Sequence, residues 1–154
     1  MRAITLPVVG PLDAKWEDLR VYLKRSFSTA TRCANWMMTT LYVRDLRREP
    51  EDKKLKKMPR QYLYPEAKKL FPELATQTLS TLEQQIQRIY RAQRYEILWM
   101  GSRSLATFRY PFPVPLPWQM CEVEKTEGGL WLLSVRLGDL RWKLKLRGGH
   151  MMHR

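Results

Sequence analysis

The stretch from Asp13 to Glu49 most constrains the fold, because it contains neither glycine nor proline. Its apolar side chains recur at spacings of three and four residues, which places them on one face of an α-helix. These apolar residues are Trp16, Leu19, Leu23, Phe27, Ala30, Ala34, Met37 and Leu41. We therefore predict one long amphipathic helix, with Asp13 as its N-cap and Pro50 ending it.

A second helical stretch begins near residue 66 or 73 and runs to residue 100, after a charged linker over residues 51–60. Ser80 and Glu83 match a capping box near its start, and Gly101 is expected to stop it. Its apolar stripe consists of Leu79, Leu82, Ile86, Ile89, Tyr90 and Ile97. The two stretches predict a helical hairpin or a small bundle.

The remaining segments have the character of strands. A short run from Ile4 to Val9 is followed by Gly10 and Pro11, which predicts a lone first strand. Between residues 110 and 117 proline occupies every second position, so this segment is extended and cannot be a helix. Three further strands are expected at residues 119–125, 130–137 and 140–147.

The last two strands can be aligned residue by residue. A two-residue loop of Gly138 and Asp139 makes them a hairpin and fixes its register. One face then carries the pairs Leu137–Leu140, Val135–Trp142, Leu133–Leu144 and Trp131–Leu146. The other face carries Arg136–Arg141, Ser134–Lys143 and Leu132–Lys145. Because a slip of one residue would exchange the two faces, this register is strongly specified. One face is expected to pack inward and the other to be basic.

These elements predict an α+β fold in which an α-helical hairpin or bundle is inserted into a small antiparallel β-barrel. The expected divisions are a first strand over residues 1–11, a helical insertion over 12–104, barrel strands over 105–148, and a disordered tail over 149–154. Cys33 and Cys121 are solitary and far apart, which favours reduced thiols over a disulfide or a zinc site.

The charge of the chain indicates its partner class. The sequence has 28 Lys and Arg against 15 Asp and Glu, a formal net charge of +13. Such an excess repels itself and is typical of proteins that bind a polyanion. No stretch reaches the roughly 20 apolar residues that span a bilayer, and no signal peptide is recognisable. We expect a cytoplasmic protein without a membrane partner; a basic protein with no polyanionic ligand is the alternative.

Four groups of residues are candidates for nucleic-acid contact. Basic side chains can meet phosphates, and nearby aromatic rings can stack on bases. The linker group is Lys53, Lys54, Lys56, Lys57 and Arg60, with Tyr62 and Tyr64 behind it. The helical groups are Arg20, Lys24 and Arg25 on the first helix, and Arg88, Arg91 and Arg94 on the second. The hairpin group is Arg136, Arg141, Lys143, Lys145 and Arg147. The alternative for the linker group is a solvated linker without a ligand. The alternative for the helical groups is the solvent-exposed side of a helix pair.

The hairpin group is the most informative, because like charges directly opposite one another destabilise a sheet. An anionic ligand would relieve that repulsion. Catalysis has little support, since the carboxylates are dispersed, and Glu122 and Glu124 are expected on one solvated strand face. The only histidines, His150 and His153, lie in the tail. The sequence contains no glycine-rich phosphate loop or nucleophile elbow. We predict no enzyme, no metal and no cofactor.

The order of these parts resembles the N-terminal lobe of type V CRISPR effectors, the Cas12 proteins, and their TnpB transposon relatives. The residues 74–79, Leu-Ala-Thr-Gln-Thr-Leu, with Arg88 and Tyr90, resemble the recognition-lobe helix of the family. The residues 101–110, Gly-Ser-Arg-Ser-Leu-Ala-Thr-Phe-Arg-Tyr, and 112–115, Phe-Pro-Val-Pro, resemble its return into the wedge barrel. The likeness in architecture covers nearly the whole chain, although its motifs are short. It adds Arg103, Arg109 and Tyr110 to the candidate contacts.

This resemblance implies a wedge domain, a barrel of the oligonucleotide-binding type, interrupted by a helical recognition domain. In that family the lobe binds the guide-RNA scaffold, the start of the guide–target hybrid and the flanking duplex of the target DNA. Cleavage belongs to a RuvC nuclease domain, which this sequence does not contain. The implied partners are a guide RNA, a target DNA duplex or RNA–DNA hybrid, and a nuclease domain or effector chain, in a prokaryotic cytoplasm. A generic RNA-binding protein and a protein-interaction or inhibitory module are the alternatives.

Overall fold

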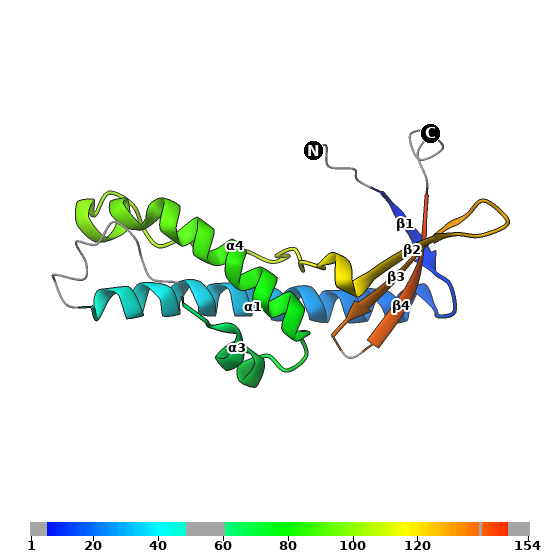
Figure 1. The fold of residues 1–154 in the computed structure, drawn as a ribbon, viewed down its shortest axis with the longest axis horizontal. Helices are drawn as coiled ribbons and strands as arrows, with labels where there is room; N and C mark the ends of the chain where they lie inside the picture. The colour runs from blue at the N-terminus through cyan, green and yellow to red at the C-terminus, as the bar shows by residue number, and fades with distance from the viewer. Residues whose placement is uncertain (1–5, 49–60, 139, 148–154) are drawn as a thin grey trace.

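A computed structural model describes residues 6–48, 61–138 and 140–147 (Figure 1). Among these described residues, three helices lie between the first and second strands: α1 (Trp16–Leu46), α3 (Tyr64–Leu70) and α4 (Thr76–Tyr95). A π-helical turn, η1 (Glu96–Met100), continues α4, and a short 3₁₀ turn, η2 (Trp118–Met120), precedes the second strand. The strands are β1 (Val8–Pro11), β2 (Cys121–Lys125), β3 (Trp131–Leu137) and β4 (Leu140–Leu146). The fold is therefore α+β, as the sequence predicts.

The four strands form one open antiparallel sheet in the order β1-β4-β3-β2. The expectation of a closed β-barrel is wrong. Strand β1 is an edge strand of four residues that includes Gly10 and Pro11, and its pairing has a bulge after Val8. The predicted start of this strand at Ile4 lies outside the described residues. An edge position suits Pro11, because proline cannot donate to a sheet ladder. A barrel would need β1 and β2 to be joined through a further strand.

The extended segment over residues 105–117 would be the obvious closing strand, but it lies along the helices instead. Its alternating prolines lack the N–H groups that a ladder requires. A side chain of α1 takes the place of a neighbouring strand: Asn35 accepts a hydrogen bond from the Phe108 N–H at 2.8 Å and donates one to the Phe108 carbonyl at 2.9 Å. The hydroxyl of Thr31 accepts from the Phe112 N–H at 3.1 Å. The segment is thereby held without joining the sheet.

The register predicted for the last hairpin is confirmed at all seven pairs, from Leu137–Leu140 to Trp131–Leu146. Gly138 has a positive φ of 65°, and a Cβ built on it would lie 2.2 Å from the carbonyl oxygen of Glu73. Glycine is therefore needed both for the turn conformation and for the close approach. The Tyr22 hydroxyl donates to the Leu137 carbonyl. The tip of the hairpin is thus fixed against α1 and the loop that precedes α4.

Helix α1 belongs to two hydrophobic cores, at opposite ends of its length (Figure 1). Near its start, Leu19 packs with Val135, Leu137 and Leu144 of the sheet. Farther along, its apolar face packs against α3 and α4. The buried residues of this second core are Ala30, Cys33, Ala34, Met37, Met38, Leu41, Leu63, Ala67, Phe71, Leu74, Leu79, Leu82, Ile86 and Tyr90. The predicted stripes of both helices are confirmed, apart from Trp16, which is exposed.

The predicted helix ends are partly wrong. Helix α1 begins after Lys15, which is the N-cap residue and makes no side-chain capping bond, so Asp13 is not the N-cap. The helix ends at Leu46, before the predicted end at Pro50, and Pro50 lies outside the described residues. The predicted second helix is divided into α3 and α4. Gly101 ends the second stretch in the left-handed conformation, with φ of 60°, as predicted.

The predicted capping box of Ser80 and Glu83 is also wrong, because both residues lie inside α4. The buried Glu83 carboxylate instead accepts hydrogen bonds from the N–H groups of Leu63 and Tyr64, at 3.0 and 2.8 Å. These N–H groups stand at the start of α3, where no carbonyl of the same helix can accept them. Glu83 therefore caps a neighbouring helix and joins α3 to α4.

Cys33 is buried, Cys121 is half-buried, and both are free thiols. Burial raises the pKa of Cys33 to about 12 and also raises that of Cys121. None of the helices within the described ranges is sufficiently long and apolar to cross a membrane.

Candidate nucleic-acid interface

The basic residues of the hairpin lie on the sheet face opposite the α1 contact. In the observed register Arg141, Lys143 and Lys145 form a row along β4, and Arg136 of β3 stands directly opposite Arg141. Arg147 follows the end of β4 and is exposed. All of these residues except Lys145, which is half-buried, are exposed to solvent. The sequence prediction of a shared face is therefore confirmed for Arg136, Arg141, Lys143 and Lys145, which lie within the paired strands.

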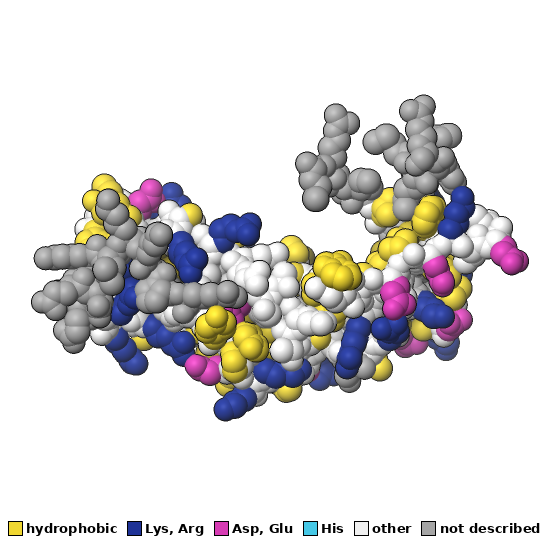
Figure 2. Space-filling model, in the orientation of Figure 1, with side chains coloured by type: hydrophobic (Ala, Val, Ile, Leu, Met, Phe, Trp, Pro, Cys, Tyr) yellow, Lys and Arg dark blue, Asp and Glu magenta, His cyan; other side chains and the backbone are white. Residues whose placement is uncertain are grey.

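The same face also carries acidic residues, which the sequence analysis treated separately. Glu122 and Glu124 of β2 pair with Ser134 and Leu132, so they point to the side of the β4 row. Glu122 lies 3.5 Å from a guanidinium nitrogen of Arg141. In Figure 2 acidic and basic side chains are interspersed at the sheet end of the molecule. The repulsion within the basic row is thus partly relieved inside the protein, and an external anion is not its only counter-charge.

The helical groups are distributed along the molecule. Arg20, Lys24 and Arg25 are exposed near the start of α1; Arg20 lies over the ring of Trp16 at 5.3 Å, and Arg25 is 3.9 Å from Glu73. Arg88 and Arg91 are exposed on α4. No ion pair with another described residue is formed by Arg20, Lys24, Arg88 or Arg91. These four cations therefore have no described carboxylate to compensate them.

Arg94, which the sequence analysis grouped with Arg88 and Arg91, is not a surface residue. It is buried against α1, where its guanidinium binds the buried Asp45, with Nη2 at 3.0 Å from Oδ1. The Tyr90 hydroxyl donates to the other oxygen of Asp45 at 2.8 Å. Burial alone would raise the pKa of Asp45, but the hydrogen bonds from Arg94 and Tyr90 and the charge of Arg94 outweigh it and lower that pKa.

The other predicted contacts have separate positions. Lys53, Lys54, Lys56, Lys57 and Arg60 lie outside the described residues. Tyr62 is exposed, whereas Tyr64 packs against the core between α1, α3 and α4, which corrects its assignment as a stacking residue. Arg103 is paired with Glu96, and Arg109 and Tyr110 are exposed on the extended segment.

The structure therefore does not gather the predicted residues into one site. The sheet packs against α1 near Leu19, whereas the end of α4 packs against α1 near Asp45. At the helical rise of 1.5 Å per residue, these two residues are separated by about 39 Å along α1. Basic side chains are spread over both ends in the view of Figure 2. A nucleic acid that contacts both the β4 row and Arg88 and Arg91 would have to extend along the molecule.

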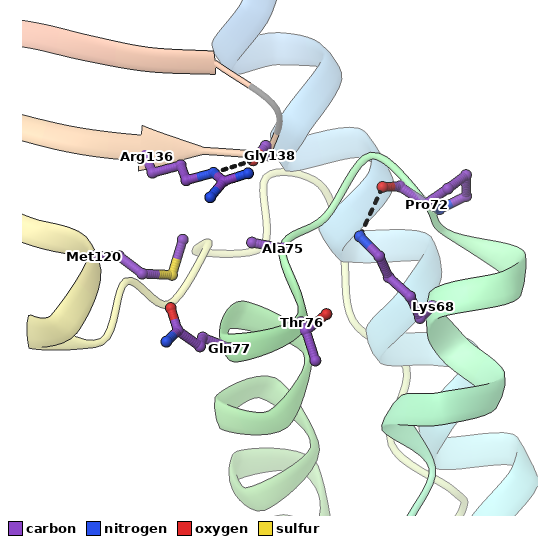
Figure 3. A pocket seen from close by; sticks show the side chains of 8 residues that line it. All are labelled: Lys68, Pro72, Ala75, Thr76, Gln77, Met120, Arg136 and Gly138. Atoms are coloured by element: carbon purple, nitrogen blue, oxygen red, sulfur yellow. Dashed lines mark hydrogen bonds between the residues drawn. The ribbon is translucent and has the colours of Figure 1, made fainter.

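A depression of about 410 Å³ lies where the hairpin tip meets the helices (Figure 3). Its lining comes from three places: Arg136 and Gly138 of the hairpin, Met120 before β2, and residues around the start of α4 with Lys68 of α3. Arg136 donates to the Gly138 carbonyl at 3.2 Å. Lys68 donates to the carbonyls of Pro72 and Leu74, at 3.0 and 2.7 Å, so its ammonium group holds the loop between α3 and α4.

Sequence reasoning missed the aromatic residues beside Arg91. Tyr95 and Trp99, at the end of α4 and in η1, are exposed and stacked on one another. Their spacing of four residues, continuing from Arg91, was the available signal. Within the described parts of the chain, no three His, Cys, Asp or Glu side chains gather closely enough to hold a metal ion. No family model matches the chain, and no curated protein matches it.

Proposed function

We propose that this chain is a non-catalytic nucleic-acid-binding module whose ligand is structured RNA or an RNA–DNA hybrid. The carrying observation is the surplus of exposed cations: the sequence has a net charge of +13, and Arg20, Lys24, Arg88 and Arg91 have no described carboxylate partner. A polyanion gains affinity from such a surface because each neutralised phosphate releases counterions.

The more specific form of the proposal follows the resemblance to type V CRISPR effectors and TnpB proteins. In this form the chain is the wedge and recognition lobe of an RNA-guided protein in the prokaryotic cytoplasm. It binds a guide-RNA scaffold and the start of the guide–target hybrid, and any cutting belongs to a nuclease domain of the effector. A protein reads an A-form duplex through its shape and its phosphate backbone rather than its sequence. Basic regions that lie apart on the protein can therefore contact phosphates at separate points along one such duplex.

A salt titration tests the general proposal. Labelled hairpin RNA is bound at a series of salt concentrations, and the logarithm of the binding constant is plotted against that of the salt concentration. We expect a steep linear decrease, since a protein that makes 6–10 phosphate contacts loses about 10³–10⁵ in affinity between 50 and 200 mM salt. A flat line would refute nucleic-acid binding and would favour a protein-interaction module. Equal affinity for unrelated RNA folds would favour a generic RNA-binding protein.

Charge reversal on β4 tests the contribution of the sheet. The double variant Arg141→Glu with Lys143→Glu should weaken RNA binding and keep the fold, because both side chains are exposed and face away from the α1 contact. Arg47→Glu with Lys69→Glu is the matched control, since it changes the net charge equally at exposed positions outside the proposed contacts. Circular dichroism verifies folding of both proteins. Equal loss of affinity in the two would mean that only the net charge matters.

The non-catalytic part of the proposal has its own test. Hydrolysis of phosphodiesters by metal ions uses carboxylates that hold two ions about 4 Å apart. RNA and DNA substrates incubated with the pure chain and magnesium or manganese should remain at full length. Metal-dependent cleavage that a single Asp or Glu substitution abolishes would refute this part of the proposal.

A further inference from the structure

One exposed face of α4 combines basic and aromatic side chains in a single row. Gln84, Arg88, Arg91 and Tyr95 follow one another at spacings of four, three and four residues, so they lie on the same side of the helix. Trp99 comes four residues later, in η1, and all five are exposed. Gln84 and both arginines of this row, with Glu83 and Gln87, line a depression of about 480 Å³. We call the five residues the α4 row.

The aromatic end of the α4 row is held in place from within the protein. The rings of Tyr95 and Trp99 are stacked, with centroids 5.9 Å apart and planes inclined by 23°. The Arg94 guanidinium lies 4.7 Å from the Trp99 centroid, and Arg94 is itself bound to the buried Asp45. The Trp99 ring is thus positioned by a group that is anchored in the core, and Trp99 in turn positions Tyr95.

The aromatic surface at the end of the α4 row remains partly open to solvent. Tyr95 is 65% exposed and Trp99 is 43% exposed, so most of the Tyr95 ring is available for a further contact. A π-helical turn such as η1 is also a feature that occurs frequently at functional sites. Arg91 and Arg88, one and two turns before Tyr95, suit an anionic ligand, and the open Tyr95 ring suits a ligand with a flat face.

We propose that a single-stranded RNA segment binds along the α4 row, with an unpaired base stacked on Tyr95 and its neighbouring phosphates bound by Arg91 and Arg88. This inference rests on the proposed function and identifies its ligand more closely. The base is unpaired because the internal bases of a duplex are already stacked on both faces, whereas proteins that bind single strands use exposed aromatic rings in a basic groove. Arg91 lies about one helical turn, 5.4 Å, before Tyr95, which places charge and ring side by side.

The first experiment uses the unaltered chain and two RNAs. One is a hairpin with a single-stranded extension of about ten nucleotides, and the other has the same extension without bases, as abasic residues. Both carry the same number of phosphates, so the difference in affinity reports on stacking alone. We expect the RNA with bases to bind about 5- to 150-fold more tightly, as aromatic stacking of one base gives. Equal affinities would overturn the inference and would not depend on the folding of any variant.

The second experiment separates the ring from the charges. Tyr95→Ala should lose that 5- to 150-fold preference and keep the salt dependence of binding, whereas Tyr95→Phe should keep both. Arg91→Gln should lower the magnitude of the salt slope by about 0.7, the value for one phosphate contact of a single strand. Trp118→Ala is the matched control, since Trp118 is an exposed aromatic residue away from the α4 row, and its loss should change neither quantity. Melting temperatures show whether each variant is folded.

The outcomes distinguish the inference from the proposed function. A chain that binds both RNAs with equal affinity and a steep salt dependence is a nucleic-acid-binding module without a stacking site, and the inference fails alone. A chain that binds neither RNA refutes both. Sedimentation of the protein without RNA gives the remaining alternative: a dimer that Tyr95→Ala converts to a monomer would assign the α4 row to self-association and would overturn the inference.

Discussion

Removal of the buried Asp45 carboxylate should destabilise the helical part of the protein strongly. In the variant Asp45→Ala the Arg94 guanidinium, whose side chain is only 8% exposed, remains in the core without its counter-charge. The Tyr90 hydroxyl loses its acceptor at the same time. Breaking one side of a buried ion pair costs about 3–5 kcal/mol, chiefly because the remaining charge is left desolvated and uncompensated.

A double variant distinguishes this penalty from the value of the pair itself. In Asp45→Leu with Arg94→Met both charges are replaced by apolar side chains, so no uncompensated charge remains. Replacing a whole buried pair in this way is often nearly neutral. We therefore expect the double variant to be more stable than Asp45→Ala by about 2 kcal/mol or more. The free energies of unfolding come from urea titrations followed by circular dichroism, with the slope of the transition checked for constancy.

The same pair makes stability depend on pH. The pKa of Asp45 is lowered in the folded state, mainly because the hydrogen bonds and charge of Arg94 outweigh desolvation. Its stabilising contribution is complete above the unfolded pKa of about 3.9 and is lost as the pH falls through the lower, folded pKa. The difference in stability between the original chain and Asp45→Asn should therefore narrow below about pH 4. A cost of Asp45→Ala below about 1 kcal/mol at pH 7, where exposed pairs fall, would refute this account of the site.

Two further substitutions test how the sheet and the extended segment are attached. Gly138→Ala should destabilise the fold by more than Gly101→Ala. Both glycines have positive φ, so both variants incur about 1–2 kcal/mol of backbone strain. Only a Cβ at residue 138 also collides with the Glu73 carbonyl. Equal melting temperatures for the two variants would contradict the close approach. Asn35→Leu should cost about 2 kcal/mol, because the Phe108 N–H and carbonyl lose their partners. Hydrogen exchange of the Phe108 amide should then accelerate, and unchanged exchange would refute the role of Asn35.

The hairpin register and the helix faces could be predicted from the sequence because short-range rules determine them. A two-residue loop at Gly138 leaves one register open to the flanking strands, and the alternation of apolar and polar residues then assigns each side chain to a face. The spacing of apolar residues defines the buried side of α1 and α4 in the same way. These predictions needed no knowledge of which distant segments meet.

The open sheet and the helix caps could not be predicted so simply, because they depend on contacts between distant parts of the chain. The predicted box at Glu83 fits a local pattern, but the side chain caps α3, which lies earlier in the sequence. The extended segment has the length of a strand, but its prolines lack the N–H groups that a ladder needs. The Asn35 amide holds it on the helices instead. A local motif does not determine which of two available partners a polar group will choose.

The burial of Arg94 was open to prediction from the helix period. Arg94 comes four residues after Tyr90, on the apolar stripe, whereas Arg88 and Arg91 do not share that stripe. Asp45 likewise follows Met37 and Leu41 at steps of four, so a carboxylate occupies a core position of α1. A buried carboxylate requires a cationic or hydrogen-bonding partner. Arg94 is available on the facing helix, and its place on the apolar stripe distinguishes it from Arg88 and Arg91.

The buried pair also explains how a small protein can present an aromatic surface to solvent without losing its shape. The exposed Tyr95 ring gains little from the hydrophobic core, and Trp99 gains only a part. Their geometry is maintained by contact with Arg94, and Arg94 keeps its orientation because Asp45 holds two of its nitrogens. A ring that is fixed before binding loses less conformational entropy when a ligand stacks on it. The ion pair therefore contributes twice, since it joins α1 to α4 and makes the end of α4 a rigid platform.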